Sequence, residues 1–247
     1  MKNLCIISSG FQLLNAYELS FSKTIKLDYY ALYDTDFEKI QILNTASFLG
    51  IDNVRYIKRV KYITYIKLLS FLRLNVNTLI FGSLGDNHML FFSKLIKFNE
   101  VFLVDDGTET LESFHRYFNK NKSLISYPKG LYFFTIFDFN TNKKQLLKNN
   151  FSCINKNSFN FSSKTFFIGQ PLEVLIDNKD YYKILKSIKL KYHELVYVAH
   201  RRDPISKINY IKNVLQIEVF VLNDIIEIYL IKTHLLPKKV ISFFSTS

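Results

Sequence analysis

Short apolar runs recur along the chain, and each ends in small or polar residues that are followed by a segment with helical spacing. Residues 4–7 lead into two serines and a glycine, residues 78–81 into a glycine-containing loop, and residues 101–104 into two aspartates and a glycine. Buried strands that alternate with helices in this way are typical of parallel sheets. The pattern therefore predicts a fold of the α/β class.

The alternation is interrupted once along the chain. From about residue 127 to 163 the sequence is rich in Asn, Lys, Ser and Phe without a clear period, and regular transitions resume after it. Such a segment between two regular regions is typical of a connection. We therefore expect a first lobe over residues 1–150, a linker over 151–164 and a second lobe over 165–247, with the ligand crevice between the lobes.

Composition excludes several classes of protein. The chain has 247 residues, of which 48% are hydrophobic and 16% aromatic, so it is far too apolar to be intrinsically disordered. Cys5 and Cys153 are too few for a disulfide framework. The first apolar run is too short for a signal peptide, and none approaches the roughly 20 residues that cross a bilayer. We therefore expect a cytoplasmic protein, soluble or peripheral on the inner face of the membrane.

Two adjacent aspartates, Asp105 and Asp106, leave the apolar run at 101–104, and Gly107 follows them. In open α/β sheets, ligands bind outside the carboxyl ends of the strands. Adjacent carboxylates repel each other, and with partial burial this raises the pKa of at least one toward the range of a general base. A solvated turn with an Asp helix cap explains the same residues, so both interpretations stay open.

A second polar cluster follows the apolar run at residues 195–198. His200 comes first, and Arg201 and Arg202 follow it, so a phosphate bound there would meet an imidazole donor and guanidinium charge. A histidine with a purely structural role is the alternative. Ser245 and Thr246 end the last apolar run and offer hydroxyl donors that suit phosphate oxygens.

Metal chemistry finds little support in the sequence. The five histidines lie far apart, and none forms a close ligand set with carboxylates, although the aspartate pair is compatible with magnesium. Neither a Walker-type phosphate-binding loop nor a dinucleotide fingerprint is present. We therefore expect neither a metal site nor a bound cofactor.

The chain carries 33 Lys and Arg against 21 Asp and Glu, a formal net charge of +12. From Val54 to Val76 basic and apolar residues interleave, as in a basic helix at a membrane surface, and an ordinary amphipathic helix packed on the sheet is the alternative. The other lysines are spread along the chain rather than gathered in one groove. We therefore expect no nucleic-acid partner.

Taken in order, the clusters resemble the bacterial sialyltransferases of glycosyltransferase family fifty-two, which act on lipooligosaccharide or capsule. The segment from Ser9 to Glu18 is similar to that family's first strand-to-helix turn. The aspartates and Gly107 match its acidic motif, Gly169-Gln170-Pro171-Leu172 looks like its second-lobe entry, and the pair Ser245-Thr246 looks like its terminal motif. The similarity extends over essentially the whole chain.

The resemblance implies a GT-B fold with two Rossmann-type lobes. It also implies an inverting, metal-independent transfer of sialic acid from its CMP ester to a sugar hydroxyl, with galactose as the expected acceptor. Asp105 or Asp106 would be the general base, His200 would donate to the departing phosphate, and Glu227 would bind the ribose. The other substrate-binding residues implied are Ser9, Gly10, Gln12, Gly107, Gly169, Gln170, Arg201, Ser245 and Thr246.

Two departures define an alternative. The His-Pro dipeptide usual in these families is His200-Arg201 here, and the sequence stops at Ser247, directly after the phosphate motif. A short second lobe that binds CMP or a membrane surface without turnover is therefore the second hypothesis. The sequence leaves a homodimer open.

Overall fold

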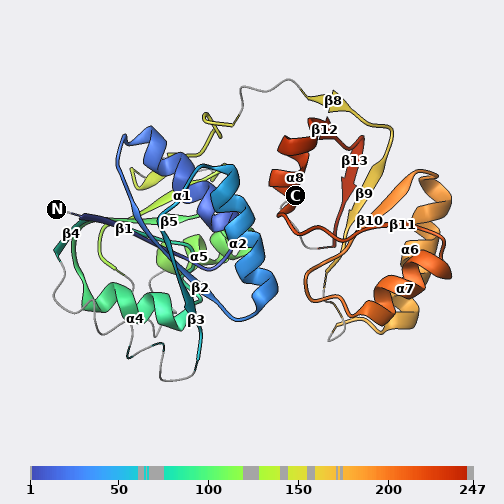
Figure 1. The fold of residues 1–247 in the computed structure, drawn as a ribbon, viewed down its shortest axis with the longest axis horizontal. Coiled ribbons are helices and arrows are strands. Elements are labelled where there is room, and N and C mark those ends of the chain that lie inside the picture. Colours follow the sequence, from blue (N-terminus) through green and yellow to red (C-terminus); the bar gives the residue numbers. More distant parts are fainter. Residues whose placement is uncertain are drawn as a thin grey trace. The chain divides into compact units, whose positions relative to one another are not determined.

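The computed structural model describes residues 2–60, 64, 66, 75–118, 128–139, 144–154, 159–170, 172 and 175–243. The chain divides into two compact units, unit 1 (Met1–Lys156) and unit 2 (Asn157–Ser247), both of the expected α/β class (Figure 1). This division falls inside the segment 151–164 that the sequence suggested as a linker.

Unit 1 is built on one parallel sheet. In the described part of the chain, its seven strands have the order β3-β2-β1-β4-β5-β6-β7, and every neighbouring pair is parallel. The strands are β1 (Lys2–Ile7), β2 (Asp28–Tyr33), β3 (Val54–Lys58), β4 (Asn75–Phe81), β5 (Lys97–Val104), β6 (Leu131–Thr135) and β7 (Leu146–Lys148).

Helices cover both faces of this sheet. Helices α1 (Gly10–Ser22) and α2 (Asp36–Phe48) bury their apolar side chains against one face. Helices α4 (Asn87–Leu95) and α5 (Thr108–Phe118) pack against the other face. The central strands are therefore apolar on both sides, which explains their continuous hydrophobic runs.

Unit 2 repeats this architecture on a smaller scale. Its main sheet has the order β11-β10-β9-β13, all parallel, with α6 and α7 on one face and α8 on the other. A short parallel pair joins β8 and β12. The elements are β8 (Asn160–Phe161), β9 (Thr165–Ile168), α6 (Asn178–Lys191), β10 (Leu195–Val198), α7 (Ile205–Asn213), β11 (Glu218–Phe220), α8 (Ile226–Thr233), β12 (Leu235–Leu236) and β13 (Lys239–Ile241).

Two predictions of local structure are wrong. The weakly patterned region 127–163 contains β6 and β7, which extend the sheet of unit 1, and β8 of unit 2. The basic helix expected from Val54 to Val76 begins as β3, which pairs with β2, and ends in β4. Between β3 and β4 the structure describes Arg59, Val60, Thr64 and Ile66, of which the last two are helical; the rest of that segment lies outside the described residues.

Candidate functional site

The carboxyl ends of the strands of unit 1 surround a cavity of about 440 Å³, hereafter the unit 1 cavity. Strand order reverses between β1 and β4, because β2 and β3 lie on one side of this pair and β5 to β7 on the other. Ligands of open α/β sheets bind at such a switch point. The cavity is lined by Ser8, Asp34, Arg59, Ser83, Gly85, Asp86, His88, Asp106 and Glu109.

Arg59 links the ends of three strands, β2, β3 and β4, at the unit 1 cavity. Its guanidinium Nη1 lies 2.9 Å from Asp34 Oδ2, and Nη2 donates to Asp86 Oδ2. Asp86 Oδ1 also accepts the backbone N–H of His88 at 2.8 Å and so caps α4. None of these residues was predicted from the sequence as part of a site. Asp34 directly follows an apolar strand and could have been found in that way, whereas Arg59 was assigned to the basic helix expected from Val54 to Val76.

Glu109 adds a fourth carboxylate to the cavity. Its Oε1 accepts the backbone N–H of Gly85 at 2.7 Å and the hydroxyl of Ser83. A Cβ at Gly85 would lie 2.5 Å from that oxygen, so a larger residue there would displace the Glu109 carboxylate. Together with Asp34, Asp86 and Asp106, it gives the described part of the lining four carboxylates against the guanidinium of Arg59, so this lining is acidic.

The two adjacent aspartates have different environments. Asp106 lines the unit 1 cavity, and its backbone N–H donates to Thr110 Oγ1 at 2.8 Å. Asp105 is 0% exposed, and its Oδ2 accepts the N–H of Ile136 at 2.7 Å, which joins the ends of β5 and β6. Burial raises the pKa of Asp105. Gly107 turns the chain with a φ of 64°, which favours glycine.

The other predicted residues of unit 1 are used within the fold. Ser9 caps α1 by accepting the N–H of Gln12 at 3.2 Å, and Gly10 is the first residue of that helix. Gln12 is 1% exposed, and its Oε1 accepts the N–H of Ser8 at 2.7 Å. It occupies the space left by Gly82, where a Cβ would clash. These residues shape the end of β1.

In unit 2, His200 follows β10, and its imidazole has a defined tautomer. Its Nδ1 accepts the N–H of Arg202 at 3.1 Å, so the neutral ring carries its hydrogen on Nε2. Burial lowers the pKa of His200, and the guanidinium of Arg201 lowers it further. Arg201 and Arg202 are exposed. His200 is therefore neutral at pH 7 and has a donor at Nε2.

A buried polar network lies under this turn. Asp203 Oδ2 accepts the N–H of His200 at 2.8 Å and the hydroxyl of Tyr197 at 2.7 Å. Asp203 Oδ1 pairs with Lys207 Nζ at 2.8 Å, with side chains 0% and 3% exposed. Lys207 also donates to the carbonyl of Gln170 at 3.2 Å. The network joins the ends of β9 and β10, and only the spacing of Asp203 and Lys207, four residues apart, hints at it in the sequence.

Gly169 fits against this network. It is buried, and a Cβ there would lie 2.5 Å from Tyr197 Oη and 2.9 Å from Asp203 Oδ2. Gly169 and Gln170 follow β9, where the strand order of unit 2 reverses between β9 and β13. We call Gly169, Gln170, His200, Arg201 and Arg202 the unit 2 strand-end site.

The remaining predicted residues are placed differently. Glu227 lies in the first turn of α8, half-buried, and burial raises its pKa. Ser245 and Thr246 lie outside the described residues. In the described ranges, no three His, Cys, Asp or Glu side chains gather as a metal ligand set. None of the described helices is long and apolar enough to span a membrane.

Among the comparisons with known proteins, matches were found with solved structures. No family model and no curated protein matches the chain. Among solved structures, a co-structure of S. aureus MnaA with UDP is similar, with a TM-score of 0.52 and 10% identity over 96% of this chain and 74% of that one. At this identity the likeness shows the fold alone: two Rossmann-type α/β units of the GT-B-like kind, as expected from the sequence.

Proposed function

We propose that the protein is a glycosyltransferase that takes a sugar from a nucleotide donor and gives it to a hydroxyl of an oligosaccharide. The observation that carries the proposal is the opposite charge of two strand-end sites on a GT-B-like fold. The unit 1 cavity gathers four carboxylates, whereas the unit 2 strand-end site presents an imidazole donor and two guanidinium groups. The first suits a hydroxyl-bearing acceptor, and the second suits a phosphate.

Asp106 is the proposed general base. It lines the cavity, whereas Asp105 is fully buried and bonded to Ile136. The acceptor hydroxyl oxygen forms a bond to the anomeric carbon of the donor sugar, its proton passes to the Asp106 carboxylate, and the bond from that carbon to the phosphate oxygen breaks. Attack on the face opposite the leaving group inverts the configuration, and a side chain positioned as base contributes roughly 10²–10⁴-fold.

His200 is proposed to stabilise the leaving phosphate. Its Nε2–H donates to a phosphate oxygen on which negative charge grows as the bond breaks, and the Asp203–Lys207 pair holds its backbone in place. A donor fixed before the reaction stabilises the transition state more than the ground state. Arg201 and Arg202 add positive charge at the same turn, and Glu227 is the proposed ribose contact.

The proposed donor is CMP-sialic acid, from the resemblance of the sequence motifs, and the proposed acceptor is a terminal galactose of lipooligosaccharide or capsule. The UDP bound to the structural relative supports a nucleotide in general. No metal ion takes part in the proposed transfer. The proposed location is the cytoplasm or the inner face of the membrane.

A donor screen tests the proposal. The purified protein is incubated with lactose and with CMP-sialic acid, another CMP-linked keto-acid or a UDP-sugar, and nucleotide release is measured. Acceptor-dependent CMP release from CMP-sialic acid supports the full proposal. Release from another donor alone supports glycosyl transfer and overturns the sialic acid assignment. CMP binding without turnover supports the second hypothesis of an impaired member, and absence of both overturns the proposal.

A further inference from the structure

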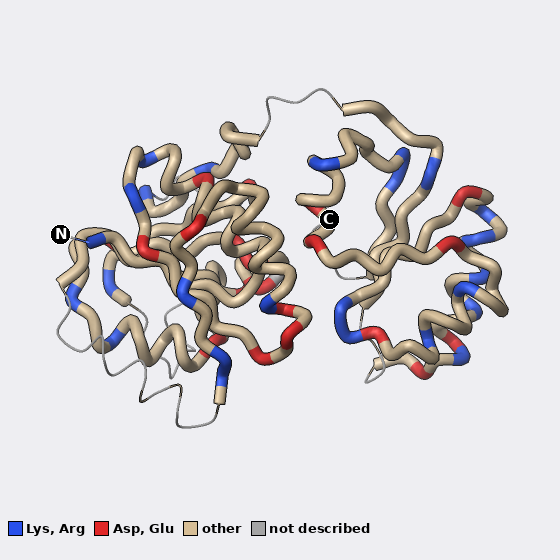
Figure 2. The backbone as a smooth tube through the Cα atoms, in the orientation of Figure 1, with Lys and Arg blue, Asp and Glu red and all other residues tan. Residues whose placement is uncertain are grey.

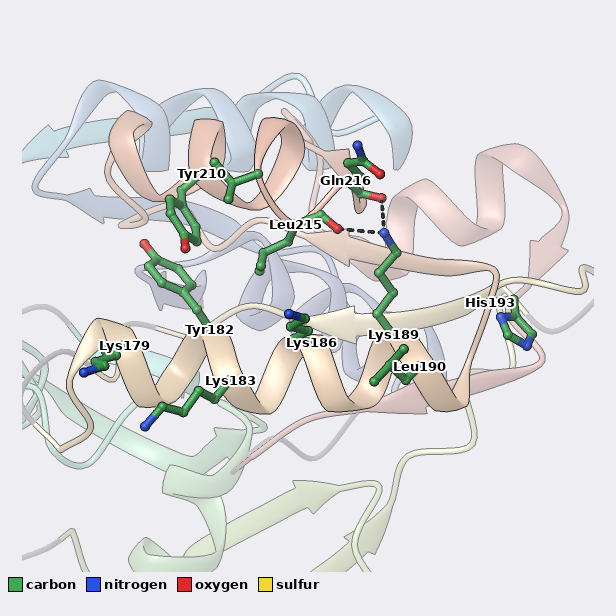
Figure 3. A pocket seen from close by; sticks show the side chains of 11 residues that line it. Lys179, Tyr182, Lys183, Lys186, Lys189, Leu190, His193, Tyr210, Leu215 and Gln216 are labelled. Atoms are coloured by element: carbon green, nitrogen blue, oxygen red, sulfur yellow. Dashed lines mark hydrogen bonds between the residues drawn. The ribbon is translucent and has the colours of Figure 1, made fainter.

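A groove of about 760 Å³ runs between α6 and α7 of unit 2, and we call it the α6–α7 groove (Figure 3). It lies on the outer side of these helices, whose inner sides pack on the sheet through Tyr181, Leu185 and Ile211. The groove shares no residue with the unit 2 strand-end site. The proposed nucleotide chemistry therefore does not account for it.

The groove is strongly basic. Lys179, Lys183, Lys186 and Lys189 line it at spacings that place them on one side of α6. Asp180 is the single acidic residue within α6, and it pairs with Lys183 at 2.7 Å on the exposed surface. Figure 2 shows the repeated positive charge along this helix. An anionic partner is therefore favoured.

Apolar side chains lie among the lysines. Leu190 is 73% exposed and Val214 is 60% exposed, and both line the groove. Tyr182 and Tyr210 stack on each other with ring centroids 4.2 Å apart, so each ring already has one face covered (Figure 3). Bases of a nucleic acid need open aromatic faces, and exposed aliphatic side chains add nothing to phosphate contacts.

We propose that the α6–α7 groove binds the surface of a bilayer that contains anionic phospholipids. Leu190 and Val214 would enter the acyl boundary, the tyrosine rings would lie at the headgroups, and the ammonium groups would meet the lipid phosphates. Lys189 already donates to the carbonyls of Leu215 and Gln216 at 2.7 and 3.0 Å, so it fixes the groove. The proposed membrane contact therefore lies on α6 and α7.

Vesicle sedimentation tests this inference independently of any turnover. The full chain is mixed with vesicles of phosphatidylcholine alone or with phosphatidylglycerol added. We expect binding only to the anionic vesicles, weakened by salt. The double variant Lys179→Gln/Lys186→Gln should lower the partition coefficient about 25-fold, since each lysine near an anionic surface contributes roughly fivefold. Leu190→Ser should weaken binding at high salt as well.

The matched control is Lys94→Gln/Lys97→Gln, which removes two exposed lysines from unit 1. We expect it to bind anionic vesicles like the wild type. Equal binding to both vesicle types, or an equal loss in the control, would overturn the proposal. It would also be overturned if the groove variant lost retention of single-stranded RNA, or self-association in light scattering, while vesicle binding stayed intact.

Discussion

The strand ends of unit 1 gather carboxylates, whereas those of unit 2 gather an imidazole and two guanidinium groups. Both units are parallel sheets with a strand-order reversal at the site. In unit 1 a half-buried ion network around Arg59 lines the cavity, and in unit 2 a fully buried pair, Asp203 with Lys207, supports the turn. The same topology therefore supports two sites of opposite charge, and the residues that follow each strand determine that charge.

The largest expected effect is a loss of turnover on substitution of Asp106, and it distinguishes Asp106 from Asp105. Asp106→Asn should lower turnover about 10³-fold, because the amide cannot accept the acceptor proton, and should leave the free energy of unfolding unchanged. Steady-state nucleotide release and urea unfolding measure the two quantities. Turnover within a few-fold of the wild type would remove Asp106 from the role of base.

The buried pair of unit 2 should matter more for stability than any exposed pair. Lys207→Met leaves the Asp203 carboxylate buried without its cation, so the free energy of unfolding should fall by about 3 kcal/mol. Lys183→Met breaks the exposed pair with Asp180 and is the matched control, with no measurable change expected. Urea unfolding of both variants compares them. Equal values would mean that the Asp203–Lys207 pair does not support the turn.

His200→Gln tests the imidazole of the unit 2 strand-end site. Loss of the fixed Nε2–H should lower turnover about 100-fold at pH 7. In the wild type, protonation of Nδ1 at acidic pH removes the acceptor of the hydrogen bond from the Arg202 N–H, which orients the ring. Because the Nε2–H then loses its fixed position, turnover should fall on the acid side. A pH profile measures this, and the variant should lack that fall. An identical acid limb in both proteins would contradict the assignment.

His200 should also give stability a defined dependence on pH. Its folded pKa lies below the ordinary value of about 6.5 because of burial. Between the two values the unfolded chain binds more protons, so the free energy of unfolding rises with pH across this window. Urea unfolding of wild type and His200→Gln should show a smaller rise in the variant. The opposite slope difference would contradict the neutral state of the ring.

The smallest expected effect is that of Asp105→Asn. The variant keeps an acceptor for the N–H of Ile136 and removes a carboxylate whose pKa is raised by burial. The free energy of unfolding at pH 7 should therefore rise slightly, and the gain should vanish as pH falls through the raised pKa. Turnover should be retained. A loss as large as that of Asp106→Asn would mean that Asp105 is the base.

The α/β class was predictable because apolar runs such as 101–104 and 195–198 end in polar residues, which is a local signal. β6 and β7 were not predicted because these two short strands lie among Asn- and Lys-rich residues that show no clear hydrophobic period. β3 was mistaken for helix because an edge strand with one exposed face alternates basic and apolar residues. In these cases sheet pairing, which is not local, decides the structure.

Part of the site was predictable in the same way. Asp106 and His200 follow long apolar runs, so their positions at strand ends could be expected. Their surroundings could not be predicted, because Arg59 and Glu109 line the cavity from separate strand ends and Tyr197 reaches Asp203 only in the folded unit. The buried role of Gln12 depends on Gly82, seventy residues away in the sequence, through a missing Cβ.

A calorimetric titration with CMP tests the division of roles between the two sites most directly. The account predicts that wild type and Asp106→Asn bind CMP with the same affinity, and that His200→Gln binds it about tenfold more weakly, as expected for one lost hydrogen bond to a charged group. A wild type that does not bind CMP, or an affinity lost in Asp106→Asn and retained in His200→Gln, would contradict it.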